Sequence, residues 1–415
     1  MKYIADFHLH SKYSRATSRD MDIPHIAEYA NYKGINIIGT SDFTHPLWLS
    51  EIKRELKEDG SGLLSYATYP KLHFILTGEI SSIYTQDGKV HKVHTLIFVP
   101  DLKTAQKINE RLMGIGNIYS DGRPIIGFSA KDLAQLVLDI NPECLIIPAH
   151  AWTPWFSVFG SNSGFDSLEE CYKELTPKIF SIETGLSSDP EMNWRLSKLD
   201  KITLISNSDA HSPGNLGREA NVFEIDDNKL SFTEITDILK TKDRQRFPYT
   251  IEFYPEEGKY HFDGHRNCNL VVNPFREKYP NNLCPKCNKK LTIGVMNRVE
   301  ELADRPPDYK NTEFPASKHL VPLREIIAAS FAVGVNSRKV EQEYLHLIQG
   351  LGNEFKILMD LDEETLAKNM DAKIVDGIKR VRRGDIDIEP GYDGVYGKVS
   401  VFGKDAAQQA QGTLF

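Results

Sequence analysis

The sequence contains no long apolar run and no short repeated unit. No hydrophobic stretch approaches the ~20 residues of a membrane-spanning helix, which argues against an integral membrane protein. The N-terminus lacks the basic, apolar and small-residue segments of a secretion signal, so we expect a cytoplasmic protein without a membrane partner. No period of roughly 20–50 residues is visible, which argues against a solenoid or a propeller.

Cysteine is scarce, because the 415 residues contain only five. An odd count that includes a Cys-x-x-Cys pair favours metal binding over disulfides. Cys144 and Cys171 stand in apolar or helical surroundings and are predicted to be core residues. The net charge of -8 argues against wholesale coating of nucleic acid. It leaves a specific contact open, since metal-ligand carboxylates count as negative although their ions neutralise them.

Apolar runs in the first 250 residues are repeatedly followed by metal-capable side chains. His8 and His10 stand one residue apart after a run that begins at Ile4. In an extended strand, side chains two residues apart share a face, so both imidazoles can reach one metal ion. Further residues of this kind adjoin the later apolar runs: Asp42 with His45, Glu79, His94, His150, Glu183, and Asp209 with His211.

Helical patterns at residues 22–32, 129–140, 167–175 and 191–199 separate several of these runs. Alternating strands and helices predict a parallel sheet, and seven such units predict a closed α/β barrel. In such barrels the site lies at the carboxyl ends of the strands, where six of the seven runs carry their ligand-type residue. One such residue alone is more often a cap or a core residue, but the repetition favours a shared metal site.

These motifs resemble those of the PHP (polymerase and histidinol phosphatase) metallohydrolases, which are distorted (β/α)7 barrels. The resemblance implies two divalent ions that share one carboxylate, with catalytic roles for Asp209, Glu79 and His150. It implies these two ligand sets: His8, His10, Glu79 and Asp209, and Glu79, His94 and His150. Arg15, Ala16 and Phe43 stand where the family usually has further ligands. A third ion, with Asp42, His45 or His211 as ligands, is therefore left open.

Such a site hydrolyses a phosphate ester, because one ion generates hydroxide while the other stabilises charge on the phosphate. Zinc, manganese and magnesium all remain candidates for the metal. Lys12, Arg15 and Arg218 are candidates to hold phosphate oxygens, although each is more often a solvated cation. Trp152 and Trp155 follow His150 and either stack on a base or roof the barrel.

A small zinc-binding module is predicted at residues 250–305. His265-x-x-Cys268 and Cys284-x-x-Cys287 are two ligand pairs separated by 15 residues, a spacing typical of one structural zinc ion. Lys286 and Arg298 near the second pair are predicted DNA contacts. A PHP barrel (residues 1–249) followed by this module resembles the endonuclease Q family of DNA-repair nucleases, and so does the segment Gly-Thr-Ser-Asp-Phe-Thr-His-Pro-Leu-Trp at 39–48.

Residues 306–402 are predicted to form a mainly helical, DNA-contacting domain that ends in a β-hairpin. Arg380, Arg382 and Arg383 lie in a basic run that either contacts the DNA backbone or is a solvated helix end. Residues 403–415 are predicted to be a flexible tail. Its last residues, Gln-Gly-Thr-Leu-Phe at 411–415, resemble the peptide that repair enzymes insert into DNA sliding clamps.

The endonuclease Q resemblance implies a metal-dependent DNA repair endonuclease. It implies cleavage of single- or double-stranded DNA on the 5′ side of uracil, hypoxanthine, xanthine or an abasic site. The alternative is a small-molecule phosphoesterase of the histidinol-phosphatase type, which needs neither the zinc module nor the basic helices. A third class, a non-enzymatic DNA- or clamp-binding scaffold, is opposed by the retained residues Glu79, His150 and Asp209.

Overall fold

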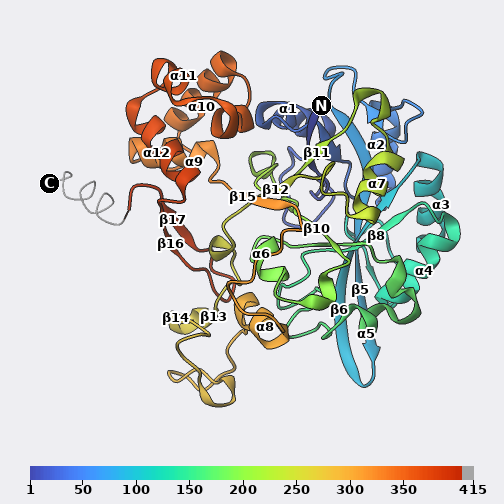
Figure 1. The fold of residues 1–415 in the computed structure, drawn as a ribbon. Helices are drawn as coiled ribbons and strands as arrows, with labels where there is room; N and C mark the ends of the chain where they lie inside the picture. Colours follow the sequence, from blue (N-terminus) through green and yellow to red (C-terminus); the bar gives the residue numbers. More distant parts are fainter. Residues whose placement is uncertain (404–415) are drawn as a thin grey trace.

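The computed structural model describes residues 1–403, and a mixed sheet of 11 strands forms its centre (Figure 1). Its main path runs β15–β12–β11–β1–β2–β5–β4–β3, while β6 and β7 pair with β5, and β8 pairs with β6. The predicted clamp-binding peptide lies outside the described residues. The strands are β1 (Lys2–Asp6), β2 (Ile37–Gly39), β3 (Lys57–Glu58), β4 (Leu64–Ser65), β5 (His73–Gln86), β6 (Lys89–Val99), β7 (Ile125–Ile126), β8 (Leu145–Pro148), β11 (Ala220–Glu224), β12 (Tyr249–Glu252) and β15 (Ala316–His319).

The predicted α/β class is confirmed, but the expectation of a parallel sheet is wrong. Strands β1, β2 and β5 run parallel, whereas the pairs β1–β11, β5–β6 and β6–β8 are antiparallel. The difference arises because β5 and β6 form one long hairpin. Its turn residues, Asp87 and Gly88, have positive φ values of 51° and 77°. Asp-Gly is the sequence that such a two-residue turn favours.

Two further strands complete the architecture around the site. β9 (Ser181–Glu183) and β10 (Thr203–Ile205) form a separate parallel pair. Backbone hydrogen bonds link this pair to the main sheet, from Ala151 N to Glu183 O and from His10 N to Ala210 O. Side-chain amides fill the remaining gap, because Asn207 Oδ1 accepts hydrogen bonds from Phe7 N and from the Asn221 side chain. The carboxyl ends of β1, β8, β9 and β10 therefore meet.

Helices cover this sheet and extend beyond it. Gly34, at φ 90°, ends α1, and the Ser129 side chain caps α4, so the predictions for residues 22–32 and 129–140 are confirmed. The predicted helix at 191–199 is wrong, because α6 stops at Asn193. The α-helices are α1 (Ile23–Lys33), α2 (Pro46–Glu55), α3 (Leu102–Met113), α4 (Ala130–Ile140), α5 (Leu168–Tyr172), α6 (Pro190–Asn193), α7 (Phe232–Thr241), α8 (Val295–Leu302), α9 (Leu323–Phe331), α10 (Arg338–Leu351), α11 (Glu363–Asn369) and α12 (Ala372–Arg383).

The later chain is continuous with the first sheet. β12 pairs with β11, and β15 pairs with β12, so the sheet runs past residue 249. One apolar cluster contains buried side chains of both α1 and the helices α9–α12. The hairpins β13 (Asp263–His265)–β14 (Leu270–Val272) and β16 (Asp387–Glu389)–β17 (Lys398–Ser400) complete the fold. The proposed domain boundaries stay predictions. Within residues 1–403, no helix is long and apolar enough to span a bilayer.

A buried ion pair joins the first sheet region to the C-terminal helices. Lys33 Nζ lies 2.8 Å from Glu354 Oε2, and both side chains are almost fully buried. The Glu354 carboxylate also accepts hydrogen bonds from the Tyr344 hydroxyl and from Leu323 N. Lys2 and Asp360 form a second pair between the same two regions, at 3.0 Å, but both of its side chains are exposed.

The Glu354→Ala variant should lower the free energy of unfolding by about 3–5 kcal/mol, because it leaves the Lys33 ammonium buried without its partner. Asp360→Ala, the matched control, should cost less than about 1 kcal/mol, because its pair is solvated. Urea denaturation measures both values. Equal losses for the two variants would contradict the assigned role of Glu354.

Candidate metal centre and its cavity

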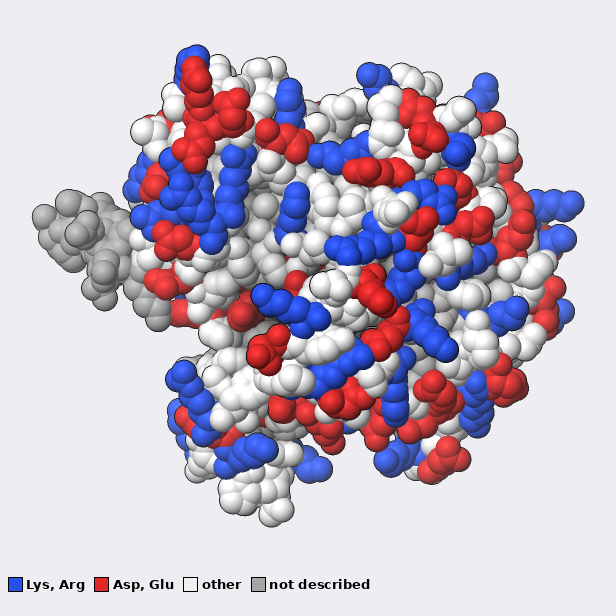
Figure 2. Space-filling model, in the orientation of Figure 1, with Lys and Arg blue, Asp and Glu red and all other residues white. Residues whose placement is uncertain are grey.

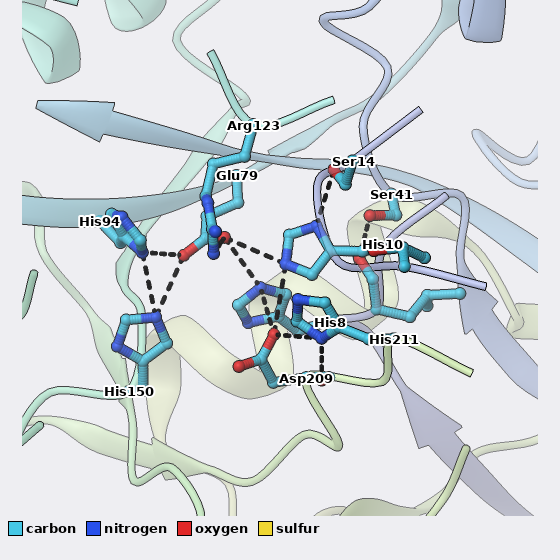
Figure 3. A network of polar contacts seen from close by, with 12 residues as sticks. His8, His10, Ser14, Ser41, Glu79, His94, Arg123, His150, Asp209 and His211 are labelled. Atoms are coloured by element: carbon cyan, nitrogen blue, oxygen red, sulfur yellow. Dashed lines mark hydrogen bonds and ion pairs between the residues drawn. The ribbon is translucent and has the colours of Figure 1, made fainter. Parts of the chain in front are cut away.

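Glu79, in the middle of β5, lies at the centre of the site with no exposed surface (Figure 3). Its Oε1 atom is 2.6 Å from His94 Nδ1 and 3.1 Å from His150 Nε2. Its Oε2 atom is 3.2 Å from His10 Nε2 and 3.5 Å from His8 Nε2. One carboxylate therefore faces two different pairs of imidazoles, as a carboxylate shared by two metal ions would.

Two further carboxylates orient the histidines that follow β1. His8 Nδ1 lies 3.0 Å from both oxygens of Glu183, and His10 Nδ1 lies 3.1 Å from Asp42 Oδ1. These contacts turn both Nε2 atoms toward Asp209 Oδ1, at 3.8 Å from His8 and 3.2 Å from His10. A carboxylate behind each imidazole is the usual arrangement around metal-bound histidine.

The donor atoms of this first group fit a cation. His8 Nε2, His10 Nε2 and Asp209 Oδ1 are buried and have no hydrogen-bond partner in the part of the chain that the structure describes. Each of these residues offers one atom within 4.8 Å of the other two. Buried polar atoms normally have partners, so converging atoms without them indicate a place for an ion.

The ionisation of the carboxylates and of His94 suits the same role. Burial alone would raise the pKa of Glu79 and Asp209, but neighbouring cationic groups hold both pKa values well below their usual range. Burial lowers the pKa of His94 to about 4, so its imidazole is neutral. His8 and His10 differ, because the carboxylates around them raise both pKa values well above their usual range against the effect of burial. Metal binding at these two imidazoles would therefore release protons.

The second group is formed by Glu79, His94 on β6 and His150 after β8. One ligand atom of each lies within 4.8 Å of the others, and His94 Nδ1 is 3.2 Å from His150 Nε2. His150 adopts a positive φ of 31°, and its backbone N–H donates to Glu183. Glu183 therefore supports both groups, which makes it a functional residue that the predicted ligand sets omit.

Asp42 belongs to neither ligand group, so its role as a metal ligand stays a prediction. Its two oxygens accept hydrogen bonds from His10 Nδ1, from Ser11 N and Oγ, and from Ser14 Oγ. His211 packs its ring against His10 at 4.6 Å and contacts the backbone oxygen of Asp209, but it belongs to neither group. His45 turns away and contacts Tyr119 O. These residues do not assemble a third ligand group within the described chain.

Two arginines lie at the centre, and one of them was not predicted. Arg123 Nη1 is 3.1 Å from Glu79 Oε2, and its irregular segment carries no motif that would reveal this position. Arg218 donates to Ser208 O and lines the adjoining cavity. Lys12 and Arg15 instead pair with Glu51 and Asp121, and Arg15 is largely exposed.

A cavity of about 580 Å³ opens beside the two groups. Its walls include Trp155, Lys259, Tyr260 and Tyr396, and the Trp155 and Tyr260 rings meet edge to face at 5.8 Å. Trp152 does not line this cavity, because it is 1% exposed and donates its Nε1–H to Asn193. The prediction that Trp152 contacts DNA is therefore corrected, and the ring is a core residue.

His265, Cys268, Cys284 and Cys287 form a separate group at the β13–β14 hairpin. Each offers one ligand atom within 4.8 Å of the other three, which is the donor set of a tetrahedral zinc site. Although burial opposes it, hydrogen bonds from the backbone N–H groups of Lys286 and Cys287 lower the pKa of the Cys284 thiol. The local core contains only Val272, Cys284 and Leu291, so a bound ion would supply much of the stability here.

The predicted DNA-contacting cations occupy different environments. Arg298 is buried and donates to Phe159 O, Phe165 O and Asp166, so it joins α8 to the loop before α5 and is corrected to a structural residue. Arg382 donates to the carbonyl oxygens of Leu358 and Ile357. The remaining cations are Arg380 and Arg383 near α12, where Figure 2 shows Lys and Arg gathered, and Lys286 beside the group of His265 and three cysteines.

Two carboxylate–imidazole groups that share Glu79 define a candidate two-metal hydrolase centre. Solved structures resemble the whole chain. PfuEndoQ, a lesion-specific endonuclease from Pyrococcus furiosus, is 33% identical, with a TM-score of 0.84 over 96% of this chain and 95% of that one. An endonuclease Q bound to a 27-mer duplex with an abasic lesion at its active site is 32% identical, with a TM-score of 0.86 over 98% of both chains. The protein belongs to the endonuclease Q family.

Sequence comparisons agree with this assignment without adding a function. A family model described as the MJ0043 C-terminal domain matches residues 322–385. The uncharacterized protein MJ0043 of Methanocaldococcus jannaschii is 34% identical over 60% of this chain. The matched segment covers only 31% of that protein. The uncharacterized protein YqxK of Bacillus subtilis is 28% identical over 90% of this chain and 91% of its own length.

The Glu183→Gln variant should weaken Mn²⁺ binding at the centre about 10–100-fold, because the carboxylate that orients His8 loses its charge. Titration of chelator-treated protein with manganese chloride measures the affinity. Glu143→Gln, an exposed glutamate outside the site, is the matched control and should bind like the unmodified protein. An unchanged affinity in Glu183→Gln would refute its positioning role.

The Cys284→Ser variant should lose about one equivalent of zinc per chain and lower the thermal stability of the β13–β14 region. Metal analysis of purified protein counts the zinc. Cys144→Ser changes a cysteine outside the group and should keep the full content. Full zinc content in Cys284→Ser would argue against a structural site.

Proposed function

We propose that this protein is a metal-dependent DNA repair endonuclease that hydrolyses the phosphodiester 5′ of a deaminated base or an abasic site. The observation that carries the proposal is the pair of ligand groups joined by Glu79 beside an aromatic-walled cavity. Membership of the endonuclease Q family supports it, and one member holds abasic-lesion DNA at its active site.

In the proposed reaction, the chain's residues hold and orient the reacting groups. His8, His10 and Asp209 would bind one divalent ion, His94 and His150 a second, and Glu79 both. Such ions, when bound, lower the pKa of a water molecule and offset charge on the phosphate. Glu183 and Asp42 hold the imidazoles in position. Arg123 and Arg218 add positive charge beside the phosphate.

The cavity would receive the lesion nucleotide after it leaves the DNA stack. A flipped base needs aromatic or apolar walls, which Trp155, Tyr260 and Tyr396 would supply. A damaged or mismatched base is less costly to unpair than a normal one, which favours lesions over intact pairs. Lys259, whose ammonium lies over the Tyr260 ring at 5.6 Å, adds positive charge at the cavity wall.

DNA outside the cavity would contact the later parts of the chain. We assign residues 250–305 to a zinc-binding module and residues 306–402 to a mainly helical DNA-contacting domain, after a distorted barrel at 1–249. Lys286 and Arg383 are exposed cations, and Arg380 is half-buried; all three would meet the phosphate backbone. The peptide at 411–415 would bind the DNA sliding clamp, a proposal that rests on its Gln-x-x-Leu-Phe sequence.

The test uses two 5′-labelled DNA duplexes that differ by a single deoxyuridine, incubated with the protein and manganese or magnesium chloride. We expect one cut on the 5′ side of the uracil, which is absent from the undamaged duplex and abolished by a chelator. Asp209→Ala should lose this cleavage but still bind the lesion duplex, because it removes a ligand and keeps the aromatic wall residues Trp155, Tyr260 and Tyr396.

Asp226→Ala, which changes an exposed aspartate, is the matched control and should cleave normally. Full cleavage by Asp209→Ala would refute the assigned centre. Cleavage of neither duplex by the unmodified protein, together with hydrolysis of small phosphomonoesters, would replace the nuclease with a phosphoesterase.

A further inference from the structure

Another cluster of metal-capable side chains lies where the loop after β9 meets β15. Asp189 precedes α6 and Glu191 lies in its first turn, while His319 is the last residue of β15. Each of the three residues offers one ligand atom within 4.8 Å of the other two. The cluster therefore brings together side chains that lie far apart in the sequence.

Hydrogen bonds hold each carboxylate by one oxygen and leave the other oxygen directed into the cluster. Asp189 Oδ1 accepts from Met192 N at 2.8 Å, and Glu191 Oε1 accepts from the Ser317 hydroxyl. Asp189 Oδ2 lies 3.4 Å from His319 Nε2. Within residues 1–403, the buried atoms Glu191 Oε2 and His319 Nε2 have no hydrogen-bond partner.

A fully buried glutamate faces the same cluster. Glu252 on β12 is in register with His319 on the parallel strand β15, so both side chains lie on one face of the sheet. Glu252 Oε1 accepts from the Ser206 hydroxyl, whereas its buried Oε2 atom has no partner among the described residues. Glu252 is 0% exposed, so solvent does not satisfy this oxygen.

Carboxyl groups outnumber basic groups in the cluster. Three carboxyl groups, those of Asp189, Glu191 and Glu252, surround one imidazole. Two of them, Glu191 and Glu252, keep a buried oxygen atom without a hydrogen-bond partner among the described residues. Such oxygen atoms beside an imidazole fit a bound cation.

We propose that Asp189, Glu191 and His319, with Glu252 behind them, bind a divalent transition-metal ion. Two or three oxygen donors with one imidazole suit Mn²⁺, Fe²⁺ or Zn²⁺. A cavity of about 530 Å³ lined by Tyr254, Ser317 and His319 provides a path for the ion. The ion would tie the loop after β9 to β15. The site is independent of the proposed nuclease activity.

Metal analysis tests this site on the full chain. Protein is stripped with a chelator, equilibrated with manganese chloride and desalted, and the bound manganese is counted per chain. Glu191→Gln keeps an oxygen for the Ser317 hydroxyl but removes the charge, so it should hold about one equivalent less than the unmodified protein. His346→Ala, an exposed histidine on α10, is the matched control and should lose none. Equal manganese in all three proteins would overturn the proposal.

Crystals of the unmodified protein soaked in manganese chloride provide a second readout that does not depend on how a variant folds. We expect an anomalous-difference peak at about 2.0–2.2 Å from His319 Nε2. An anomalous-difference peak at the Glu79 centre in the same crystal shows that manganese has entered the crystal. A peak at the Glu79 centre without one at His319 would also overturn the proposal.

Discussion

Glu79 is a carboxylate without solvent contact, and the geometry of the whole centre follows from the need to compensate its charge. An unpaired buried charge costs several kcal/mol, so the surrounding groups must supply compensating partners. The Arg123 guanidinium supplies a positive charge, and four imidazoles from separate parts of the chain supply polar contacts. Because each Glu79 oxygen serves a different pair of histidines, the position of one side chain sets the distance between both ligand groups.

The side chains that hydrogen-bond to the ligand residues are positioned as closely as the ligand residues themselves. Glu183 contacts His8 Nδ1, His150 N and the Asn207 amide, and Asn207 in turn accepts from Phe7 N. The same hydrogen bonds therefore orient the histidines and join β10 to β1, where no regular strand ladder connects them. In this region, the stability of the sheet and the orientation of the ligands depend on the same side chains.

Much of this centre could be predicted because metal-capable side chains beside apolar runs are visible in the sequence, although Glu79 and His94 lie inside β5 and β6 and not at the expected strand ends. His8, His10, Glu79, His94, His150 and Asp209 each adjoin an apolar run, and the structure brings all six together. The pattern does not reveal which way a side chain faces, so it does not separate Asp42 from the residues of the two ligand groups. Arg123 follows no periodic pattern, so only the folded chain shows its contact with Glu79.

The strand directions were harder to predict than the ligands. The antiparallel β5–β6 pair depends on the two-residue turn at Asp87 and Gly88. A prediction based only on alternating strands and helices does not include this turn. Trp152 and Arg298 were predicted to contact DNA, but both side chains are buried. An aromatic ring or a guanidinium near a site can support the core as well as a ligand, and sequence alone does not separate these roles.

Four residues of the cavity wall come from three distant parts of the chain: Trp155, the Lys259–Tyr260 pair and Tyr396. The ligand residues around Glu79, by contrast, are all present by residue 209. On a ribosome, which releases the N-terminal part first, these ligand residues emerge before Tyr260 and Tyr396. A growing chain would therefore hold its ligand residues before the wall of the cavity is complete.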